Sequence, residues 1–447
     1  MGMKQILVMM AAVVLVGCSN ETPETSQAAE AEPQVATKPT PEPTPVSPAD
    51  EKLIAEPILE KAVREELGKP EGELTEADLA KVIALELHES KTTDAGLKGL
   101  AKLQMLQRLY AGGTQITDAG LEEIAKLQKL ERLYLEYTQI TDVGLKAVAK
   151  LQMLTSLGLN DTQITDTGLK EVAKLQKLEE LYLEYTQITD VGLKAVANLQ
   201  MLTSLGLNGT QITDASLKEV TKLQMLQQLY LGGTQITDAG LEEVAKLQQL
   251  KELGLNDTQI TDESLKEVTN LKNLTALDLR YTQITDEGLK KVAKLQQLER
   301  LNLDGTKITD VGLKEVAKLK NLEELWLWDT KITDLGLKEV AKLQKLKRLT
   351  SSRKITDEGL KEVAKLQKLK MLSLGYTQIT DAGLMEVAKL QKLEYLGLSD
   401  TQITDAGLME VAKLKKLHTL DLSDTQTTKE GVAELKKALP NLGILDL

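Results

Sequence analysis

The sequence contains no phenylalanine, and aromatic residues make up only 2% of its 447 residues. Leucine supplies most of the apolar mass, which suits a core of stacked, similar layers better than an irregular globule. The single cysteine, Cys18, excludes an internal disulfide. A formal charge of -12 argues against nucleic acid as a partner, because the chain would repel phosphate.

Side chains suited to catalysis or metal binding are also scarce. The only histidines are His88 and His418, at opposite ends of the repeating part of the chain. There is no glycine-rich phosphate loop and no metal-ligand spacing, and the many carboxylates recur with the repeat. The sequence therefore predicts neither an enzyme nor a bound cofactor or metal.

The N-terminal segment has the features of an export signal. Residues 6–16 form an apolar run, which is shorter than the about twenty residues of a membrane-spanning helix and fits a secretory signal. The run ends in "LVGC", residues 15–18, which resembles the lipobox of bacterial lipoproteins. The resemblance implies that residues 1–17 are removed and that Cys18 is lipidated. Ser19 then implies sorting to the outer rather than the inner membrane, and an ordinary cleaved signal is the alternative.

Residues 18–50 have a different composition. They hold seven of the ten prolines, together with Thr, Glu, Ala and Ser. The stretch "KPTPEPTPVSP" cannot bury a core and predicts an extended or disordered linker. Such a linker would tether a folded part to a membrane through the lipid at Cys18.

From about residue 84 the chain repeats itself every 24 residues. Each unit begins L-x-x-L-x-L-x-x-T-x-I, as in "LERLYLEYTQITDVGLKAVAKLQK", residues 130–153. The pattern resembles that of leucine-rich repeat proteins, and "ITDxGL" resembles their cysteine-containing and related bacterial subtypes. The resemblance covers residues 84–447 in about fifteen units. It implies an α/β solenoid curved like a horseshoe, with a parallel sheet on the concave face and helices on the convex face.

The side chains of one unit lead to the same architecture. In "LYL", Leu133 and Leu135 point inward and Tyr134 points outward. We expect Thr138 to bond its hydroxyl to the backbone of the turn after the strand, and Asp142 to cap the N-terminus of the following helix. One unit alone cannot bury both its strand face and its helix face, so the units must stack.

The two ends of the array differ from its middle. Residues 51–83 predict two helices around a Gly-Lys-Pro turn, and they resemble the helical cap that precedes the repeats of internalin-like bacterial proteins. Residues 428–447 predict a longer helix, a proline stop and a final strand with an open edge.

Tyrosines alternate with glycines along the first half of the predicted concave face, in a 48-residue double unit. Strands two apart lie about 10 Å from each other, so tyrosine ridges would flank a glycine-floored groove for an extended peptide or a glycan. Duplication of an older unit is the alternative explanation. The candidate tyrosines are Tyr134, Tyr137, Tyr182, Tyr185 and Tyr230.

The only tryptophans, Trp326 and Trp328, occupy outward positions beside inward Leu325 and Leu327. Exposed tryptophan is enriched at interface hot spots. The following unit has lost one residue, its second leucine and its usual threonine, so two departures from the pattern are adjacent. We predict a partner-binding site here, and a drifted repeat whose rings pack on their neighbours is the alternative. Charged residues assigned to this site are Arg300, Arg348, Asp304 and Asp329.

These features favour a non-catalytic, lipid-anchored scaffold of the bacterial cell envelope that binds a protein on its concave face. A glycan or cell-wall binder that stacks sugars on tyrosine and tryptophan rings is the second hypothesis. The repeat subtype also resembles the recognition arms of ubiquitin-ligase adaptors and some secreted effectors. The lipobox argues against that third reading.

Overall fold

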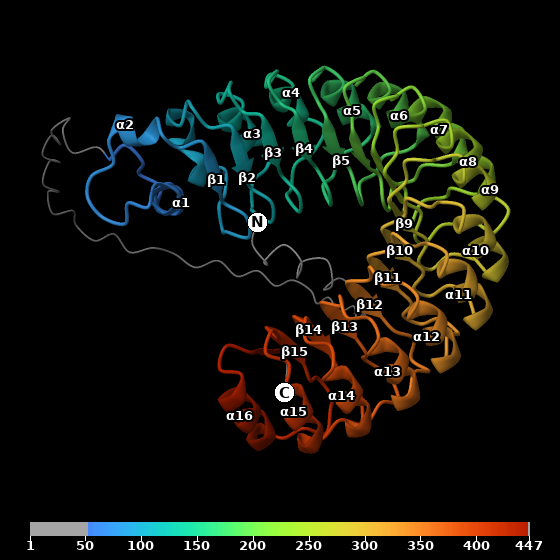
Figure 1. Ribbon diagram of the computed structural model, residues 1–447. Coiled ribbons are helices and arrows are strands. Elements are labelled where there is room, and N and C mark those ends of the chain that lie inside the picture. Colours follow the sequence, from blue (N-terminus) through green and yellow to red (C-terminus); the bar gives the residue numbers. More distant parts are fainter. Residues whose placement is uncertain (1–51, 446–447) are drawn as a thin grey trace, which may run out of the picture. The chain divides into compact units, whose positions relative to one another are not determined.

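The computed structural model describes residues 52–445, and these form a curved repeat array (Figure 1). A sixteen-stranded parallel sheet lines the inner side of the array, and helices line its outer side. The strands lie side by side in the order of the sequence. The predicted α/β solenoid is therefore confirmed. The predicted export signal, residues 1–17, and the predicted linker, residues 18–50, lie outside the described residues.

Each strand has three residues, and its central residue is leucine in every strand except the last, where it is Ile444. The strands are β1 (Ala84–Glu86), β2 (Arg108–Tyr110), β3 (Arg132–Tyr134), β4 (Ser156–Gly158), β5 (Glu180–Tyr182), β6 (Ser204–Gly206), β7 (Gln228–Tyr230), β8 (Glu252–Gly254), β9 (Ala276–Asp278), β10 (Arg300–Asn302), β11 (Glu324–Trp326), β12 (Arg348–Thr350), β13 (Met371–Ser373), β14 (Tyr395–Gly397), β15 (Thr419–Asp421) and β16 (Gly443–Leu445).

Two helices precede the first strand, and short helices then alternate with the strands, as 3-10 turns in the first unit. The helices are α1 (Pro57–Leu67), α2 (Glu76–Leu79), η2 (Ala95–Leu97), η3 (Leu100–Lys102), α3 (Asp118–Ile124), α4 (Leu145–Val148), α5 (Asp166–Val172), α6 (Asp190–Val196), α7 (Asp214–Val220), α8 (Asp238–Val244), α9 (Leu265–Val268), α10 (Asp286–Val292), α11 (Asp310–Val316), α12 (Asp334–Val340), α13 (Asp357–Val363), α14 (Asp381–Val387), α15 (Asp405–Val411) and α16 (Lys429–Ala438).

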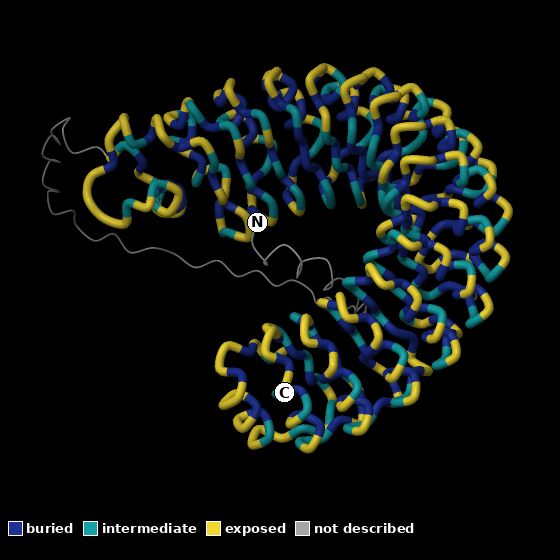
Figure 2. The backbone as a smooth tube through the Cα atoms, in the orientation of Figure 1, coloured by how far each residue is buried: buried dark blue, intermediate teal, exposed yellow. Residues whose placement is uncertain are grey.

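The leucines form continuous columns because equivalent residues pair in register. Leu133 of β3 pairs with Leu157 of β4, and Leu157 pairs with Leu181 of β5. All three are fully buried, as is Leu135, which confirms their predicted inward direction. Figure 2 shows buried residues within each unit and exposed residues along the outer edge of the array. Each unit thus buries its apolar faces against its neighbours, at roughly 25 cal/mol per Å² of apolar area.

The turn after each strand is held by a threonine hydroxyl. Thr138 is buried, and its Oγ1 donates to the carbonyl oxygen of Leu135 at 2.6 Å, which confirms the role expected from the sequence. Equivalent threonines bond in the same way along most of the array, for example Thr186 to Leu183 and Thr234 to Leu231. A buried carbonyl would be costly without such a donor.

The prediction that Asp142 caps its own helix is wrong. Helix α4 has Gly144 at its N-cap, and no side chain caps it. The Asp142 carboxylate instead accepts from the backbone N–H of Thr165, at 2.8 Å, and from the Thr165 hydroxyl. Thr165 is the residue that caps α5, because its Oγ1 accepts from the N–H of Thr167 at 3.2 Å. The aspartate therefore joins one unit to the next.

This Asp–Thr pair recurs along the outer margin as a ladder. It begins with Asp94 and Thr117 and ends with Asp405 and Thr428, with one pair in each intervening unit. The hydrogen bonds from the backbone and hydroxyl of Thr428 lower the pKa of Asp405. The threonine of the neighbouring unit thus favours the ionised form of this carboxylate.

The glycine of "ITDxGL" is explained by the same ladder. A Cβ added at Gly168 would collide with Oδ1 of Asp142 and would lie 2.8 Å from Cδ1 of Leu145. Glycine lets the aspartate of the preceding unit approach the helix that it supports. Two units carry serine at this place, Ser216 and Ser264, and each hydroxyl donates to the threonine carbonyl three residues earlier.

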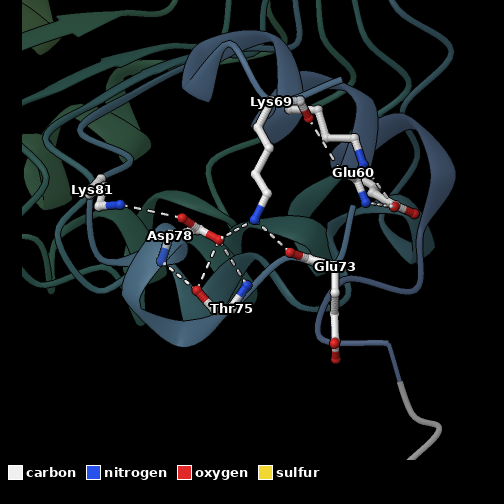
Figure 3. Close-up of polar contacts among 7 residues, drawn as sticks. Glu60, Lys69, Glu73, Thr75, Asp78 and Lys81 are labelled. Carbon is white, nitrogen blue, oxygen red and sulfur yellow. Dashed lines mark hydrogen bonds and ion pairs between the residues drawn. The ribbon is translucent and has the colours of Figure 1, made fainter. Parts of the chain in front are cut away.

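The N-terminal end is covered by α1 and α2, which confirms the predicted pair of helices. Gly68 ends α1 in the left-handed conformation, and the Gly-Lys-Pro turn follows. Asp78 lies at the centre of the turn's polar contacts (Figure 3). It accepts from Nζ of Lys69 at 2.8 Å and from the backbone and hydroxyl of Thr75. These donors, Lys69 above all, lower the pKa of Asp78 and fix the start of α2.

The C-terminal unit has the longer helix and the final strand that its sequence predicts. Helix α16 spans Lys429–Ala438 and is capped by Thr428. Strand β16 pairs with β15, with Ile444 opposite Leu420.

Candidate binding face

The residues that flank each central strand leucine face the inner side of the sheet. Tyr134, Tyr182 and Tyr230 are all half-buried there rather than standing free. The hydroxyl of Tyr134 lies 2.9 Å from Oγ of Ser156, and that of Tyr230 donates to Oε2 of Glu252 at 2.9 Å. Burial raises the pKa of all three phenols. These rings contact the next strand, so part of their surface already contributes to the packing of the fold.

The predicted glycine-floored groove is not formed. A Cβ added at Gly158 would lie 2.8 Å from Cδ1 of Tyr134 and would collide with the carboxylate of Glu136. The carboxylate of Glu184 fills the corresponding place above Gly206. The glycines give room to side chains of the preceding unit, and this close approach explains their alternation with tyrosine.

The two glutamates that fill these places are poorly solvated. Burial raises the pKa of Glu136, and it raises the pKa of Glu184 to about 7. The Oε2 atom of Glu184 is buried and has no hydrogen-bond partner among the described residues. Proximity to Glu136 adds to the effect, because two carboxylates on one face repel each other.

The tryptophan strand has the orientation that the sequence predicts. Leu325 and Leu327 are fully buried, whereas Trp326 and Trp328 are partly exposed on the inner side. Trp326 lies between Asn302 and Thr350 in the sheet register. The neighbouring strands therefore flank Trp326, and both rings keep part of their surface in contact with solvent.

Asp304 holds the backbone of the tryptophan strand. Its Oδ1 accepts from the N–H of Trp328 at 2.6 Å. Burial raises the pKa of Asp304 to about 7, and the charges of Asp278 and Asp329 add to that rise. Arg280 offsets part of it. Asp304, a predicted site residue, is thus hydrogen-bonded to the backbone of Trp328.

A cation missed in the sequence completes the cluster. The guanidinium carbon of Arg353 lies 4.4 Å from the centroid of the Trp328 ring and 5.7 Å from that of Tyr376. Its Nε also lies 3.6 Å from a carboxylate oxygen of Asp329. Arg353 comes from the unit that lacks one residue. Counting along the repeat therefore does not predict its position.

The two arginines assigned to the site from sequence are paired elsewhere. Arg300 forms an ion pair with Glu252 at 2.7 Å, and Arg348 forms one with Glu324 at 3.5 Å. Within residues 52–445, the cation–aromatic contact to a tryptophan comes from Arg353 instead. Arg300 and Arg348 therefore border the cluster, and Arg353 lies within it.

The shortened unit repairs its turn with two serines. Ser351 and Ser352 are buried, and Oγ of Ser352 donates to the carbonyl oxygen of Thr330 at 2.9 Å. Strand β12 keeps its register, and the Asp334–Thr356 pair keeps the ladder across a spacing that is one residue shorter. The missing residue is absorbed between the strand and Ile355.

Four tyrosines occupy one place in the turn after the strand, with the left-handed backbone conformation. We call them the tyrosine row: Tyr137, Tyr185, Tyr281 and Tyr376 have φ values of 56°, 56°, 55° and 61°. Their exposed fractions are 66%, 64%, 47% and 50%, respectively. Tyr137 and Tyr185 are among the tyrosines predicted to line the site, whereas Tyr281 and Tyr376 are not. The signal was present, because "YTQIT" occurs at each of the four.

Comparison with known proteins agrees with this architecture. The family described as "Leucine-rich repeat region" matches residues 234–373. The family described as "Leucine Rich repeat" matches six units: 126–149, 150–173, 174–197, 222–245, 365–388 and 389–412. Together the two cover more than half of the chain. The chain belongs to the leucine-rich repeat proteins.

Solved structures of other leucine-rich repeat proteins resemble it at low sequence identity. An internalin, InlF, of Listeria monocytogenes has 24% identity and a TM-score of 0.43, over 88% of this chain and 96% of that one. A leucine-rich repeat protein of Leptospira interrogans has 25% identity and a TM-score of 0.44, over 83% and 97%. The functional domain of InlJ from L. monocytogenes has 19% identity and a TM-score of 0.45, over 87% and 78%. No curated protein matches significantly.

Over residues 52–445, no group of three or more His, Cys, Asp or Glu side chains is placed to hold a metal ion. His88 follows β1, and His418 precedes β15 near the other end of the array. None of the helices in this range has the length and apolarity needed to cross a membrane. Proteins of this repeat class generally serve as protein-binding scaffolds.

Proposed function

We propose that this leucine-rich repeat protein is a non-catalytic scaffold of the bacterial cell envelope, lipid-anchored at Cys18, that recognises a protein partner on its concave face. The observation that carries the proposal is the cluster of Trp326, Trp328 and Arg353. It combines half-exposed indole rings, a stacked guanidinium and the nearby carboxylate of Asp329. Tryptophan and arginine are the residues most often found at interface hot spots.

The support for a binding role is energetic. An indole that is only partly covered gains from further burial, at roughly 25 cal/mol per Å². The ion pair of Arg353 with Asp329 is about half exposed and contributes little to the stability of the fold. A partner could therefore compete for either charge at small cost. The rigid strands below the cluster keep the rings in place, which lowers the entropy lost on binding.

The anchoring part of the proposal rests on the sequence alone. "LVGC" at residues 15–18 supports lipidation of Cys18, and Ser19 supports retention in the outer membrane. Metabolic labelling with a clickable palmitate analogue tests this in cells. The wild-type chain should take up label and sediment with outer-membrane vesicles, and Cys18→Ala should do neither. Release of an unlabelled wild-type chain into the medium would contradict the anchor.

A pull-down from envelope extract tests the binding site. The baits are residues 51–447 and the same chain with Trp326→Ala and Trp328→Ala, and circular dichroism establishes that both are folded. Arg108→Ala, an exposed change on β2, is the matched control. A protein captured by the wild type and the control, and lost with the tryptophan variant, would support the proposal. Equal capture by all three would contradict the tryptophan site.

The same baits address the glycan alternative. Sugars stack on aromatic rings, and the tyrosine row and the tryptophans supply rings on one molecule. Co-sedimentation with purified peptidoglycan, lost with the tryptophan variant and insensitive to salt, would favour that alternative. Binding of a protein should instead weaken with added salt, because Asp329 and Arg353 are charged.

A further inference from the structure

We propose that the tyrosine row is a docking surface for a basic segment of the protein partner, and that arginine or lysine side chains of that segment lie against its rings. The inference rests on the proposed function, because it names the chemistry of the partner. It concerns the turns that follow the strands, and it meets the tryptophan cluster at Tyr376, whose ring centroid lies 5.7 Å from the guanidinium carbon of Arg353.

The row is costly to the isolated protein. A bulky residue in the left-handed conformation is strained relative to glycine, because its Cβ crowds the backbone. Other units place Gly113, Gly209, Gly233 or Gly305 at the same point, and several place aspartate, which tolerates this conformation. Tyr137 and Tyr185 accept the strain and remain about two-thirds exposed. The core gains little from them in return.

The chain itself shows what such a ring can hold. Arg353 lies between Trp328 and Tyr376, with its guanidinium carbon 4.4 Å and 5.7 Å from the two centroids. A carboxylate oxygen of Asp329 is 3.6 Å from Nε of Arg353. Ring, cation and carboxylate thus meet in these turns. A cation is attracted to the face of an aromatic ring even at an exposed site.

Within residues 52–445, no cation lies over the ring of Tyr281 as Arg353 lies over that of Tyr376. The N–H of Tyr281 donates to the carbonyl oxygen of Asp304 at 2.8 Å, and its ring packs onto Gly305, where an added Cβ would collide with it. One unit earlier, the N–H of Asp257 donates to the carbonyl oxygen of Arg280 at 3.0 Å. Among the described residues, neither Asp257 nor Asp304 belongs to an ion pair. Arg280 is paired with Asp278 at 3.2 Å.

Electrostatics supports a cationic occupant. The pKa of Tyr281 is raised, first by burial and then by the charges of Asp304, Asp329 and Asp257. Asp161 lies beside Tyr137 in the same way and contributes to the raised pKa of that phenol. Asp329 is paired with Arg353, and Asp304 gains its charge only as it ionises around its pKa of about 7. Asp257 has no ion-pair partner among the described residues, so the negative charge beside Tyr281 is only partly compensated within the chain, whose formal charge is -12. An acidic or neutral segment would lack this complementarity.

The test uses peptides as probes, because the partner is unidentified. A fluorescein-labelled peptide of alternating glycine and arginine, about twelve residues long, spans roughly 40 Å when extended. Peptides with glutamate or glutamine in place of arginine are its counterparts. Fluorescence anisotropy is measured with residues 51–447 and with the quadruple variant Tyr137→Gly, Tyr185→Gly, Tyr281→Gly and Tyr376→Gly. Glycine is the residue that other units carry at this place, and the net charge is unchanged.

The matched control removes exposed apolar side chains at one equivalent place in four units. Val143 lies just before α4, and Val191, Val311 and Leu335 lie in the first turn of α6, α11 and α12. Their exposed fractions are 65%, 60%, 57% and 64%, respectively. Their replacement by serine should leave binding of the arginine peptide unchanged. The tyrosine variant should bind that peptide about tenfold more weakly, since several cation–aromatic contacts are lost together. The wild type should bind the glutamate and glutamine peptides far more weakly than the arginine peptide.

Equal binding of the arginine peptide by the wild type and the tyrosine variant would overturn the inference, because general attraction to an acidic protein would explain it. Equal binding of the three peptides would overturn it as well. These outcomes are independent of the pull-down. A partner lost with the tryptophan variant but retained by the tyrosine variant would leave the proposed function standing and refute the row. Absence of any captured partner would count against the proposed function alone.

Discussion

Arg353 lies over the ring of Trp328, with its guanidinium carbon 4.4 Å from the ring centroid. The two residues come from adjacent units, and the second of these is the shortened one. The contact therefore links the two irregular features of the array, and it can be observed directly because the chain has only two tryptophans.

Removal of Arg353 should expose Trp328 without unfolding the array. In a Trp326→Phe background, Trp328 is the only fluorophore of its kind, and Arg353→Ala should increase its quenching by acrylamide and shift its emission to the red. The stability cost should be under about 1 kcal/mol, because the contact is partly exposed. Lys354→Ala is the control. Unchanged quenching in the Arg353 variant would show that the stacking does not persist in solution.

Replacement of Glu184 by glutamine should change how stability depends on pH. Burial raises the pKa of this carboxyl to about 7, whereas in the unfolded chain it is about 4.3. Between these values the unfolded state releases its proton and the folded state keeps it. Stability contributed by this group therefore falls as pH rises from about 4 to about 7, and the penalty is complete above that.

Chemical denaturation from pH 4.5 to pH 8 measures this effect. Glu184→Gln should be more stable than the wild type at pH 8, and the difference should shrink toward pH 4.5. The exposed change Glu263→Gln is the control and should run parallel to the wild type. A constant difference between Glu184→Gln and the wild type at all pH values would contradict the raised pKa.

Replacement of Thr189 by valine should weaken the ladder between two units. The substitution removes the hydroxyl that donates to Asp166 and that accepts from the N–H of Val191. We expect a loss of about 1–2 kcal/mol, as for the loss of a helix cap. Hydrogen exchange should show faster opening of α5 and α6 than of distant helices. Thr167→Val, at an exposed site that is valine in other units, should change neither.

Replacement of Gly168 by alanine tests why the repeat needs glycine there. The new Cβ would collide with the Asp142 carboxylate and lie 2.8 Å from Cδ1 of Leu145. We expect a loss of about 1–3 kcal/mol from overpacking, seen as a lower midpoint in urea. Alanine stabilises a helix relative to glycine by about 1 kcal/mol. A variant more stable than the wild type would therefore mean that Asp142 and Leu145 move away from the new Cβ at little cost.

The sequence was sufficient to predict those structural features that depend on the periodicity of the repeat. The inward direction of Leu325 and Leu327, the hydroxyl contact of Thr138 and the turn at Gly68 all follow from local pattern, and all three are present. In these cases each residue acts within its own unit or column, so the repeat alone decides its surroundings.

The sequence was insufficient where a side chain acts on the following unit. Asp142 bonds to Thr165, which is 23 residues away, and the expectation of a local cap could not anticipate that. Glu136 fills the space over Gly158, so the expected groove is closed by a side-chain direction that no spacing reveals. Arg353 was missed because a deletion displaced it from the regular register.

The deletion near Arg353 also shows where this architecture permits a change of length. Between Thr350, which still pairs with Trp326, and Ile355, the shortened unit loses a residue without breaking either the sheet or the Asp–Thr ladder. The rest of each unit is fixed in length by those two sets of bonds. Insertions and deletions can therefore accumulate in the turns that follow the strands while the scaffold remains the same. These turns carry the tyrosine row, so a change of binding specificity need not disturb the fold.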